Sequence, residues 1–251
     1  MRTVAIVNHK GGVGKTTLAV SLAAAWAGDG GRALLVDLDG QASASAWLGV
    51  LDDGTDRMLA TFAAAGPLYV VGSTVAGLDV APASPALARL DAVLAGQPDA
   101  VTALRPALES VAGRFAWAVI DTPGAFGLAT LAAIAAASVV VVPVEPSLLA
   151  VAQLGEALAT IDRVRSRLAP ALPPAIIAPV RVDVRTVLAR DVVAGLRQRF
   201  GGAVTASTLR ESVRMREAPG AHAPIGAYDP NGAAAADVAA LAREIAQRVA
   251  P

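Results

Sequence analysis

The stretch that decides the fold is residues 8–17, which read Asn8-His9-Lys10-Gly11-Gly12-Val13-Gly14-Lys15-Thr16-Thr17. It follows an apolar run at residues 4–7 and precedes a helical pattern that extends over residues 15–27. When a glycine-rich loop joins a buried strand to a helix, its backbone N–H groups point at a common centre and can bind an anion. We therefore expect this loop to hold a phosphate group.

The side chains of the loop make the prediction more specific. The Lys15 ammonium is expected to reach the β- and γ-phosphates of a nucleotide, and the Thr16 hydroxyl is expected to ligate Mg²⁺. The common phosphate-loop pattern has a glycine six residues before its lysine, whereas this chain has His9 there and an additional Lys10. Lys10 and Lys15 are the only lysines among 21 basic residues, which indicates that a compact ammonium is needed at both positions.

Composition excludes several classes of protein. The chain has 251 residues, 55% of them hydrophobic and 17% charged, so it can form a sizeable core and is not disordered as a whole. The absence of cysteine excludes disulfide frameworks, thiolate zinc sites, iron–sulfur clusters and cysteine nucleophiles. The longest apolar stretch, residues 128–144, is too short for a membrane span and is interrupted by Ser138 and Pro143. With no apparent signal peptide, we expect a cytoplasmic protein.

Short apolar runs alternate with longer helical patterns along the chain. Strands are predicted at residues 4–7, 33–36, 116–120, 139–144, 175–180 and 203–205, and helices at residues 15–27, 85–94, 100–111, 128–137, 148–168, 187–200 and 233–249. Residues 40–84 are expected to be irregular. This pattern predicts a single α/β domain over residues 1–251, with a doubly wound, mainly parallel sheet covered by helices on both faces.

Three carboxylates follow predicted strands. Asp37 and Asp39 come after the second strand, and Asp121 comes after the third. Solvated turns would also place acids there, but ligands of open α/β sheets bind at the carboxyl ends of the strands. With a phosphate loop at the same edge, Asp39 is the stronger functional candidate.

Several segments together resemble the ParA/MinD class of P-loop ATPases, which have a deviant Walker A motif. Residues 10–17 resemble that motif, residues 34–41 the second acidic motif, residues 118–123 the Walker B motif, and residues 140–146 the strand and turn that follow it. Residues 217–230 resemble the C-terminal stretch of ParA/Soj partition ATPases. The resemblance therefore covers nearly the whole chain and implies a P-loop NTPase fold.

The resemblance also implies roles for individual residues. ATP and Mg²⁺ are the implied cofactors, and the implied nucleotide-binding residues are Lys10, Gly11, Gly12, Val13, Gly14, Lys15, Thr16 and Thr17. Lys10 would cross the interface of an ATP-dependent homodimer, where it has no obvious carboxylate partner in its own sequence. Lys15 would keep its phosphate contact, and Asp39 would orient the attacking water during slow hydrolysis. Thr16, Asp37 and Asp121 would surround Mg²⁺, the two carboxylates through water.

Three departures from the family pattern concern local loop geometry and adenine contacts. Gly40 replaces the proline that usually follows the second acidic residue, and Gly124 stands where a second proline is common. Residues 207–210 lack the usual Ile-Pro-Arg. None of these changes affects the residues expected to bind phosphate.

Basic residues gather in the second half of the chain. Residues 1–158 contain 8 basic and 13 acidic residues, whereas residues 159–251 contain 13 and 8. Eight arginines lie within residues 181–216, which we call the arginine segment. Its predicted helix, residues 187–200, has an expected apolar stripe of Leu188, Val192, Leu196 and Phe200, with Arg190 and Arg197 on another face. A solvated helix surface and a surface for nucleic acid phosphates both fit this pattern.

The resemblance to ParA/Soj proteins favours DNA. Arg185 and Arg214 match arginines that these proteins use for sequence-independent binding of double-stranded DNA. The full predicted set is Arg185, Arg214, Arg190, Arg197, Arg210 and Arg216. No aromatic residues alternate with these arginines, so we expect phosphate contacts without base stacking.

The predicted function is that of a nucleoid-associated partition ATPase that acts with a ParB-type centromere-binding protein. A ParA-like ATPase that positions another cargo is an alternative. A MinD-like membrane-associated ATPase is a second one, but the alanine-rich C-terminal helix lacks the bulky apolar and basic faces that membrane binding needs, so no membrane partner is expected. The absence of cysteine excludes nitrogenase-type iron proteins and iron–sulfur scaffolds.

Overall fold

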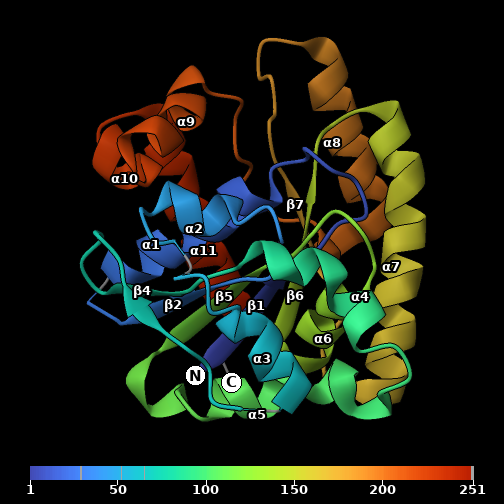
Figure 1. Cartoon of the computed structure of the whole chain (residues 1–251). Helices are drawn as coiled ribbons and strands as arrows, with labels where there is room; N and C mark the ends of the chain where they lie inside the picture. The colour runs from blue at the N-terminus through green and yellow to red at the C-terminus, as the bar shows by residue number, and fades with distance from the viewer. Residues whose placement is uncertain (29, 52, 65, 250–251) are drawn as a thin grey trace.

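The computed structural model describes every residue except 29, 52, 65, 250 and 251 (Figure 1). A seven-stranded sheet in the order β3-β4-β2-β5-β1-β6-β7 forms its centre. All pairs of neighbouring strands are parallel except β3 and β4 at one edge. The strands are β1 (Arg2–Ile6), β2 (Ala33–Asp37), β3 (Val71–Gly72), β4 (Leu78–Ala81), β5 (Trp117–Asp121), β6 (Val139–Val144) and β7 (Ile176–Pro179).

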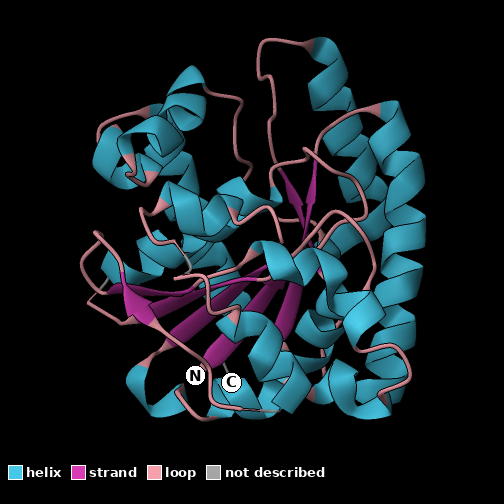
Figure 2. Cartoon of the chain, viewed as in Figure 1, coloured by secondary structure: helices cyan, strands magenta, loops and turns pink. Residues whose placement is uncertain are grey.

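Helices lie on both faces of this sheet (Figure 2). The α-helices are α1 (Lys15–Gly28), α2 (Ser43–Trp47), α3 (Arg57–Ala64), α4 (Leu90–Val93), α5 (Leu104–Glu109), α6 (Leu128–Ala136), α7 (Leu148–Leu168), α8 (Val187–Phe200), α9 (Val213–Glu217), α10 (Ile225–Tyr228) and α11 (Ala233–Arg248). Short 3₁₀ turns are η1 (Pro85–Arg89), η2 (Pro98–Thr102), η3 (Ala112–Arg114), η4 (Gly201–Ala203) and η5 (Ala218–Ala221).

Side chains of the strands alternate between two apolar clusters, as the period of two in a strand requires. In β1, Val4 and Ile6 pack in the cluster that includes α1, α2 and α9–α11. Ala5 packs in the opposite cluster, to which α3–α8 contribute. This arrangement confirms the predicted doubly wound, mainly parallel α/β fold. Among the described residues, no helix combines the length and apolarity that a membrane crossing requires.

Residues 40–84 are more regular than expected. They contain α2, α3, β3 and β4, and β4 extends the sheet by pairing in parallel with β2. The prediction failed because these elements are short: β4 has four residues and α2 has five. Elements of this length do not show a hydrophobic period in the sequence.

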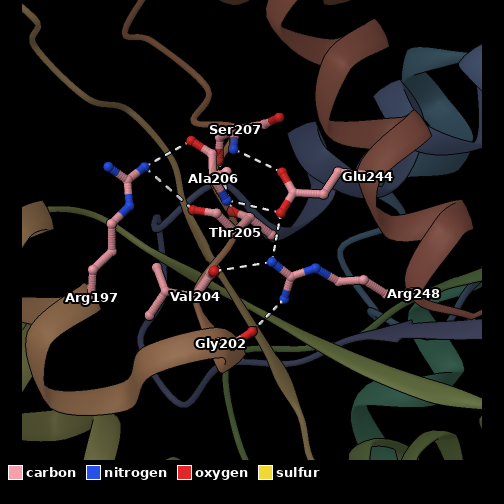
Figure 3. A network of polar contacts seen from close by, with 8 residues as sticks. All are labelled: Arg197, Gly202, Val204, Thr205, Ala206, Ser207, Glu244 and Arg248. Carbon is pink, nitrogen blue, oxygen red and sulfur yellow. Dashed lines mark hydrogen bonds and ion pairs between the residues drawn. The ribbon is translucent and has the colours of Figure 1, made fainter.

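The predicted strand at residues 203–205 does not form a ladder. Only Val204 makes a bridge, to Ile177 of β7. Side chains hold the segment instead, as Figure 3 shows. The three side chains are Arg197, Glu244 and Arg248, and they bond to backbone groups of residues 202–207. Charged groups of α8 and α11 thus fix the segment in addition to this single bridge.

The apolar stripe predicted on α8 is correct only in part. Leu188 is exposed, whereas Ala189 and Val193 are buried against Val182 in a small separate cluster. The N-terminal part of α8 extends beyond the sheet (Figure 1), and of the first three residues of this helix only Ala189 is buried. The buried face is therefore rotated from the predicted one.

Candidate functional site

The glycine-rich loop between β1 and α1 is anchored to two neighbouring strands. Asn8 Nδ2 donates to the carbonyl oxygen of Pro143 in β6 at 2.6 Å, and Asn8 Oδ1 accepts from the Lys10 amide at 3.0 Å. The Thr122 hydroxyl, directly after β5, donates to the carbonyl oxygen of Ile6 at 2.7 Å. These bonds fix the start of the loop at the carboxyl edge of the sheet.

The backbone N–H groups of residues 11–17 are unpaired: within the part of the chain that the structure describes, none of them donates to an acceptor. Gly12 and Gly14 have φ angles of +72° and +93°, in the left-handed region that favours glycine. A row of unpaired amides that continues into a helix N-terminus is an anion site. The predicted phosphate-binding residues are therefore brought together as the sequence suggested.

Lys15 is buried at this site, with only 7% of its surface exposed. Its Nζ donates to the carbonyl oxygen of Lys10 at 3.1 Å, which keeps the ammonium folded over the loop. Burial lowers the pKa of Lys15, and the nearby carboxylates of Asp121 and Asp39 partly oppose this effect. The ammonium thus occupies a dry position in which an added anion is strongly stabilised.

Asp37 and Asp121 end the neighbouring strands β2 and β5 and lie opposite each other in register. Both are completely buried. Asp37 Oδ2 accepts from the amide and hydroxyl of Ser45 at 2.9 and 2.7 Å, and its Oδ1 accepts from the Asp39 amide at 3.1 Å. Burial raises the pKa of Asp37, although these hydrogen bonds oppose the shift. Asp37 therefore has defined partners within the protein.

Asp121 differs from Asp37, because neither of its carboxylate oxygens has a hydrogen-bond partner among the described residues. Burial raises the pKa of Asp121 well above its ordinary value, and repulsion from Asp37 adds to the shift. The neighbouring Thr16 hydroxyl and Lys15 ammonium oppose this shift only in part. A buried carboxylate without a partner is costly unless a ligand satisfies it.

The donor set at this edge fits Mg²⁺ bound together with a nucleotide. Over residues 1–28, 30–51, 53–64 and 66–249, no group of three or more acidic or histidine side chains could hold an ion by itself. Mg²⁺ usually keeps several waters and takes one or two protein ligands alongside phosphate oxygens. Thr16 and Asp121 supply such a partial set, whereas the oxygens of Asp37 are already occupied.

Asp39 lies in the loop after β2 and is only partly buried. Its Oδ1 accepts from the Gln41 amide at 3.0 Å, and its charge acts on Lys15, which places it near the phosphate loop. The neighbouring Gly40 is explained by close packing, since a Cβ there would lie 2.8 Å from the Ala88 amide nitrogen. Proline is thus excluded at position 40 by the backbone of η1.

The expectation that Lys10 has no carboxylate partner in its own chain is wrong. Lys10 Nζ lies 4.0 Å from Oε2 of Glu145, and both side chains are about one-third exposed. Glu145 directly follows β6, which is the neighbour of β1 in the sheet. The fold therefore brings the two residues together although they are far apart in the sequence.

Sequence reasoning missed a role for Arg181 at this site. Its guanidinium contacts the loop at Gly12. The side chain also lines a cavity of about 190 Å³, together with Gly14, Thr17 and several residues between 209 and 219. Arg181 lies two residues after the end of the buried strand β7, so the rule that ligands bind beyond the carboxyl ends of strands could have identified it.

Most of the predicted DNA-binding arginines already have partners. Arg185 makes two bonds to Asp183, Arg214 bonds to Glu217, Arg216 to Glu211, Arg210 makes two bonds to Asp237, and Arg197 bonds to two backbone carbonyls. Arg190 is exposed and has no ion-pair partner among the described residues. The predicted set is therefore charged but largely compensated.

Besides the exposed Arg190, the predicted arginines divide into two groups by position. Arg185 and Arg216 line one surface hollow of about 380 Å³, and Arg185 is 86% exposed. Arg214 is exposed on α9. In contrast, Arg210 is held by α11 through Asp237, and Arg197 belongs to the contacts that fix residues 205–206 (Figure 3).

Comparisons with known proteins identify the family of this chain. A family model described as "AAA domain" matches residues 1–173. The chain is 39% identical to the chromosome-partitioning ATPase Soj of Thermus thermophilus over 249 residues, which cover 99% of this chain and 97% of that protein. It is 34% identical to the sporulation initiation inhibitor protein Soj of Bacillus subtilis, with 98% of each chain covered.

Among solved structures, the chain resembles the cobyrinic acid a,c-diamide synthase of Mycobacterium smegmatis, determined with a bound ATP analogue and magnesium. The TM-score is 0.84, with 28% sequence identity, and the match covers 99% of this chain and 95% of that one. The family model and the two Soj relatives span most of the chain, including the loop and the strand-end carboxylates. The chain therefore belongs to the ParA/Soj family of P-loop ATPases.

Proposed function

We propose that this chain, acting as one domain over residues 1–251, is an ATP-dependent partition ATPase of the cytoplasm and nucleoid. It binds ATP with Mg²⁺, forms a homodimer, holds double-stranded DNA without regard to sequence, and hydrolyses ATP slowly with a ParB-type partner. The observation that carries the proposal is the row of unpaired amides at residues 11–17 beside the unpartnered carboxylate of Asp121. The Soj relatives support the partition role.

The phosphates of ATP are expected to accept hydrogen bonds from these amides and from Lys15. To reach a phosphate, Lys15 exchanges its bond to the Lys10 carbonyl for a charge-assisted one. Because this ammonium is buried, the exchange is more favourable than it would be in water. The cavity beside Gly14 and Thr17 is the expected position of the base.

Thr16 and Asp121 are the residues that would hold Mg²⁺, with Asp121 acting through water. When bound, the ion supplies positive charge that offsets the charge on the phosphates. We assign Asp37 to a supporting role, because its oxygens hold Ser45 and the Asp39 amide. Its place in the predicted metal set is thus indirect.

Hydrolysis depends on Asp39 in this proposal. The carboxylate is partly exposed, lies near Lys15 and accepts a hydrogen bond from the Gln41 amide. The Asp39 amide donates to the carboxylate of Asp37, which fixes the backbone at this position. A carboxylate in this position can orient a water molecule for attack on the terminal phosphate. A single positioning group without further donors fits a slow ATPase.

Lys10 is the link between ATP and dimerisation. Its ammonium makes only a long, partly exposed ion pair with Glu145. Giving up this contact to reach a second molecule would therefore cost little. In a face-to-face dimer it would neutralise phosphates bound to the partner. ATP, which has the additional γ-phosphate, should therefore favour the dimer over ADP.

DNA binding is assigned to the exposed members of the arginine segment, Arg185, Arg214, Arg190 and Arg216. Arg197 and Arg210 support this surface, because their guanidinium groups are occupied by the protein itself. A dimer doubles the number of phosphate contacts, so dimerisation should switch the affinity for DNA. Because these arginines contact phosphates and not base edges, DNA of any sequence should bind about equally well.

The proposal is tested by measuring binding of the full chain to two unrelated DNA duplexes by fluorescence anisotropy, with ATP, ADP or no nucleotide and with Mg²⁺. We expect tight binding to both duplexes with ATP only, and faster phosphate release when a ParB-type protein is added. Binding that is equal in all three nucleotide states would contradict the proposal. DNA binding without stimulation by any ParB-type protein would favour a ParA-like ATPase that positions another cargo.

A different candidate comes from the name of the similar Mycobacterium smegmatis structure, which is that of an amide-forming synthase. The partition role is favoured because identity to the Soj relative is higher, 39% against 28%. The two functions are separated by phosphate release in the presence of DNA or of an amine donor. Release that requires the amine donor would support the synthase.

A further inference from the structure

Arg181 reaches from the end of β7 to the phosphate loop. Its Nη1 donates to the carbonyl oxygen of Gly12 at 3.0 Å. The same nitrogen lies 3.5 Å from Glu145 Oε2, and Nη2 lies 3.8 Å from Glu211 Oε1. The guanidinium is therefore held from two sides by carboxylates while it holds the loop.

The backbone of Arg181 is also unusual, with a φ angle of +53°. A non-glycine residue adopts this conformation only where the surrounding structure enforces it. Here both neighbours are fixed by hydrogen bonds: the Val180 amide donates to the Val144 carbonyl at 2.9 Å, and the Val182 amide donates to the Leu209 carbonyl at 3.1 Å. The chain thus holds the arginine in an unfavourable backbone conformation directly beside its nucleotide site.

We propose that Arg181 is a positioning residue of the phosphate loop that orients the peptide between Gly12 and Val13 toward the nucleotide phosphates. This inference rests on the proposed binding of ATP by the loop. The C=O and N–H groups of a trans peptide point in opposite directions, and no cis peptide is present among the described residues. An arginine that holds the Gly12 carbonyl on one side therefore turns the Val13 N–H to the other side.

The Val13 amide is suited to this role. It donates to no acceptor in the described part of the chain, and the Val13 side chain is buried, which limits rotation of the peptide. Without Arg181, the flexible glycine at position 12 would let this peptide turn over. The amide would then be lost as a phosphate donor in part of the molecules.

Two other roles for Arg181 must be separated from this one. Arg181 lines the cavity beside Gly14, so it could contact the base of the nucleotide instead of organising the loop. Its contacts with Glu145 and Glu211 could also serve stability alone. Inorganic tripolyphosphate distinguishes the first role because it has phosphates but no base, and thermal unfolding distinguishes the second.

The main variant is Arg181→Gly. Glycine adopts positive φ readily, so this variant removes the side chain and relieves the backbone at the same time. Arg181→Lys keeps the charge and can reach only one of the two acceptors, Gly12 or Glu145. Glu145→Gln removes one of the groups that hold the guanidinium. Arg167→Ala, on the exposed end of α7, is the matched control for loss of one positive charge.

The experiment measures binding of MgATP and of magnesium tripolyphosphate to the full chain by isothermal titration calorimetry. For Arg181→Gly we expect both affinities to fall by the same factor, about tenfold, with no loss of melting temperature. Arg181→Lys should recover part of the affinity, Glu145→Gln should lose less than Arg181→Gly, and Arg167→Ala should match the wild type.

Three results would overturn the inference. Loss of ATP affinity with unchanged tripolyphosphate affinity would show that Arg181 contacts the base. Unchanged affinity for both ligands would show that the loop orients itself without Arg181, and a lower melting temperature in proportion to the lost affinity would indicate a structural role. If the wild type bound neither ligand, the proposed function would fail as well, which distinguishes that failure from the other three.

Discussion

The phosphate-loop edge and the arginine segment are both rich in polar groups, but they differ in whether those groups have partners within the protein. At the loop edge, the amides of residues 11–17 and the carboxylate of Asp121 have no partner among the described residues, and Lys15 is buried. In the arginine segment, exposed guanidinium groups such as that of Arg185 are already paired. One region therefore needs a ligand to satisfy it, whereas the other is satisfied without one.

This difference determines how strongly each region indicates a function. An unpaired carboxylate in a buried site, such as that of Asp121, destabilises the fold unless a ligand compensates for the cost. Exposed ion pairs contribute little to stability and are common on surfaces that bind nothing. The ATP site is therefore indicated by geometry alone, whereas the DNA surface depends on the family.

The comparison is tested most strongly by Lys15→Ala. The variant removes the charged donor from the loop, so affinity for MgATP should fall by at least about 100-fold. The fold should not be weakened, because burial lowers the pKa of Lys15 and the ammonium is costly to bury. Isothermal titration calorimetry and thermal unfolding measure the two effects. Near-normal ATP binding by this variant would remove the loop from the nucleotide site.

Asp39→Ala should separate chemistry from binding at the same edge. We expect turnover to fall by about 100-fold, because the variant loses the group that positions water. Affinity for ATP should change little, since Asp39 donates nothing to the phosphates. The variant should accumulate as an ATP-bound dimer that still binds DNA, which light scattering and anisotropy can detect. Unchanged turnover would move the role to another group, with Asp37 the next to examine.

Asp121→Asn should stabilise the ligand-free protein while it removes activity. An amide avoids burying a charge that has no partner, so the free energy of unfolding near neutral pH should rise by about 1–3 kcal/mol. The raised pKa of Asp121 gives the pH dependence. Below the pKa that Asp121 has in the unfolded chain, the carboxyl is protonated in both states and does not destabilise the fold. As the pH rises from there through the higher pKa of the folded state, the free energy of unfolding falls. Denaturant unfolding should therefore show a flatter pH profile for the variant.

The contrast between the two regions was only partly visible in the sequence. Residues 8–17 predicted the loop because the motif is local, and the valine-rich β6 was predicted with its correct bounds. The contact of Arg181 with Gly12 was not predictable in the same way, because the two residues are 169 positions apart and meet only through the strand order. The pairing of Arg210 with Asp237 likewise depends on how α11 packs.

Arg210→Ala should reveal the structural group within the arginine segment. Arg210 Nε and Nη2 bond to the two oxygens of Asp237 at 2.6 and 2.9 Å, and the pair is partly shielded from solvent. Its loss should lower the free energy of unfolding by up to about 1 kcal/mol. DNA affinity should stay within experimental error of the wild type in filter binding at a fixed ATP concentration. A clear loss of DNA affinity without a change in stability would return Arg210 to the binding surface.

The smallest expected effect is on DNA binding by Arg185, and it tests the comparison directly. Asp183 holds Arg185 through two bonds of 2.8 and 2.9 Å, and these bonds lower the pKa of Asp183 to about 2. DNA phosphates must compete with this carboxylate, so Arg185→Ala should weaken binding only severalfold at physiological salt. The slope of log affinity against log salt should fall by at most about two units for the dimer, since each contact contributes about 0.9.

Asp183→Asn should act in the opposite direction, because it releases the guanidinium and removes a negative charge from the surface. Filter binding over a salt series with Arg185→Ala, Arg214→Ala and Asp183→Asn measures all three against the wild type. If Asp183→Asn bound DNA no better than the wild type, internal pairing would not limit this surface, and the distinction between the two regions would fail there.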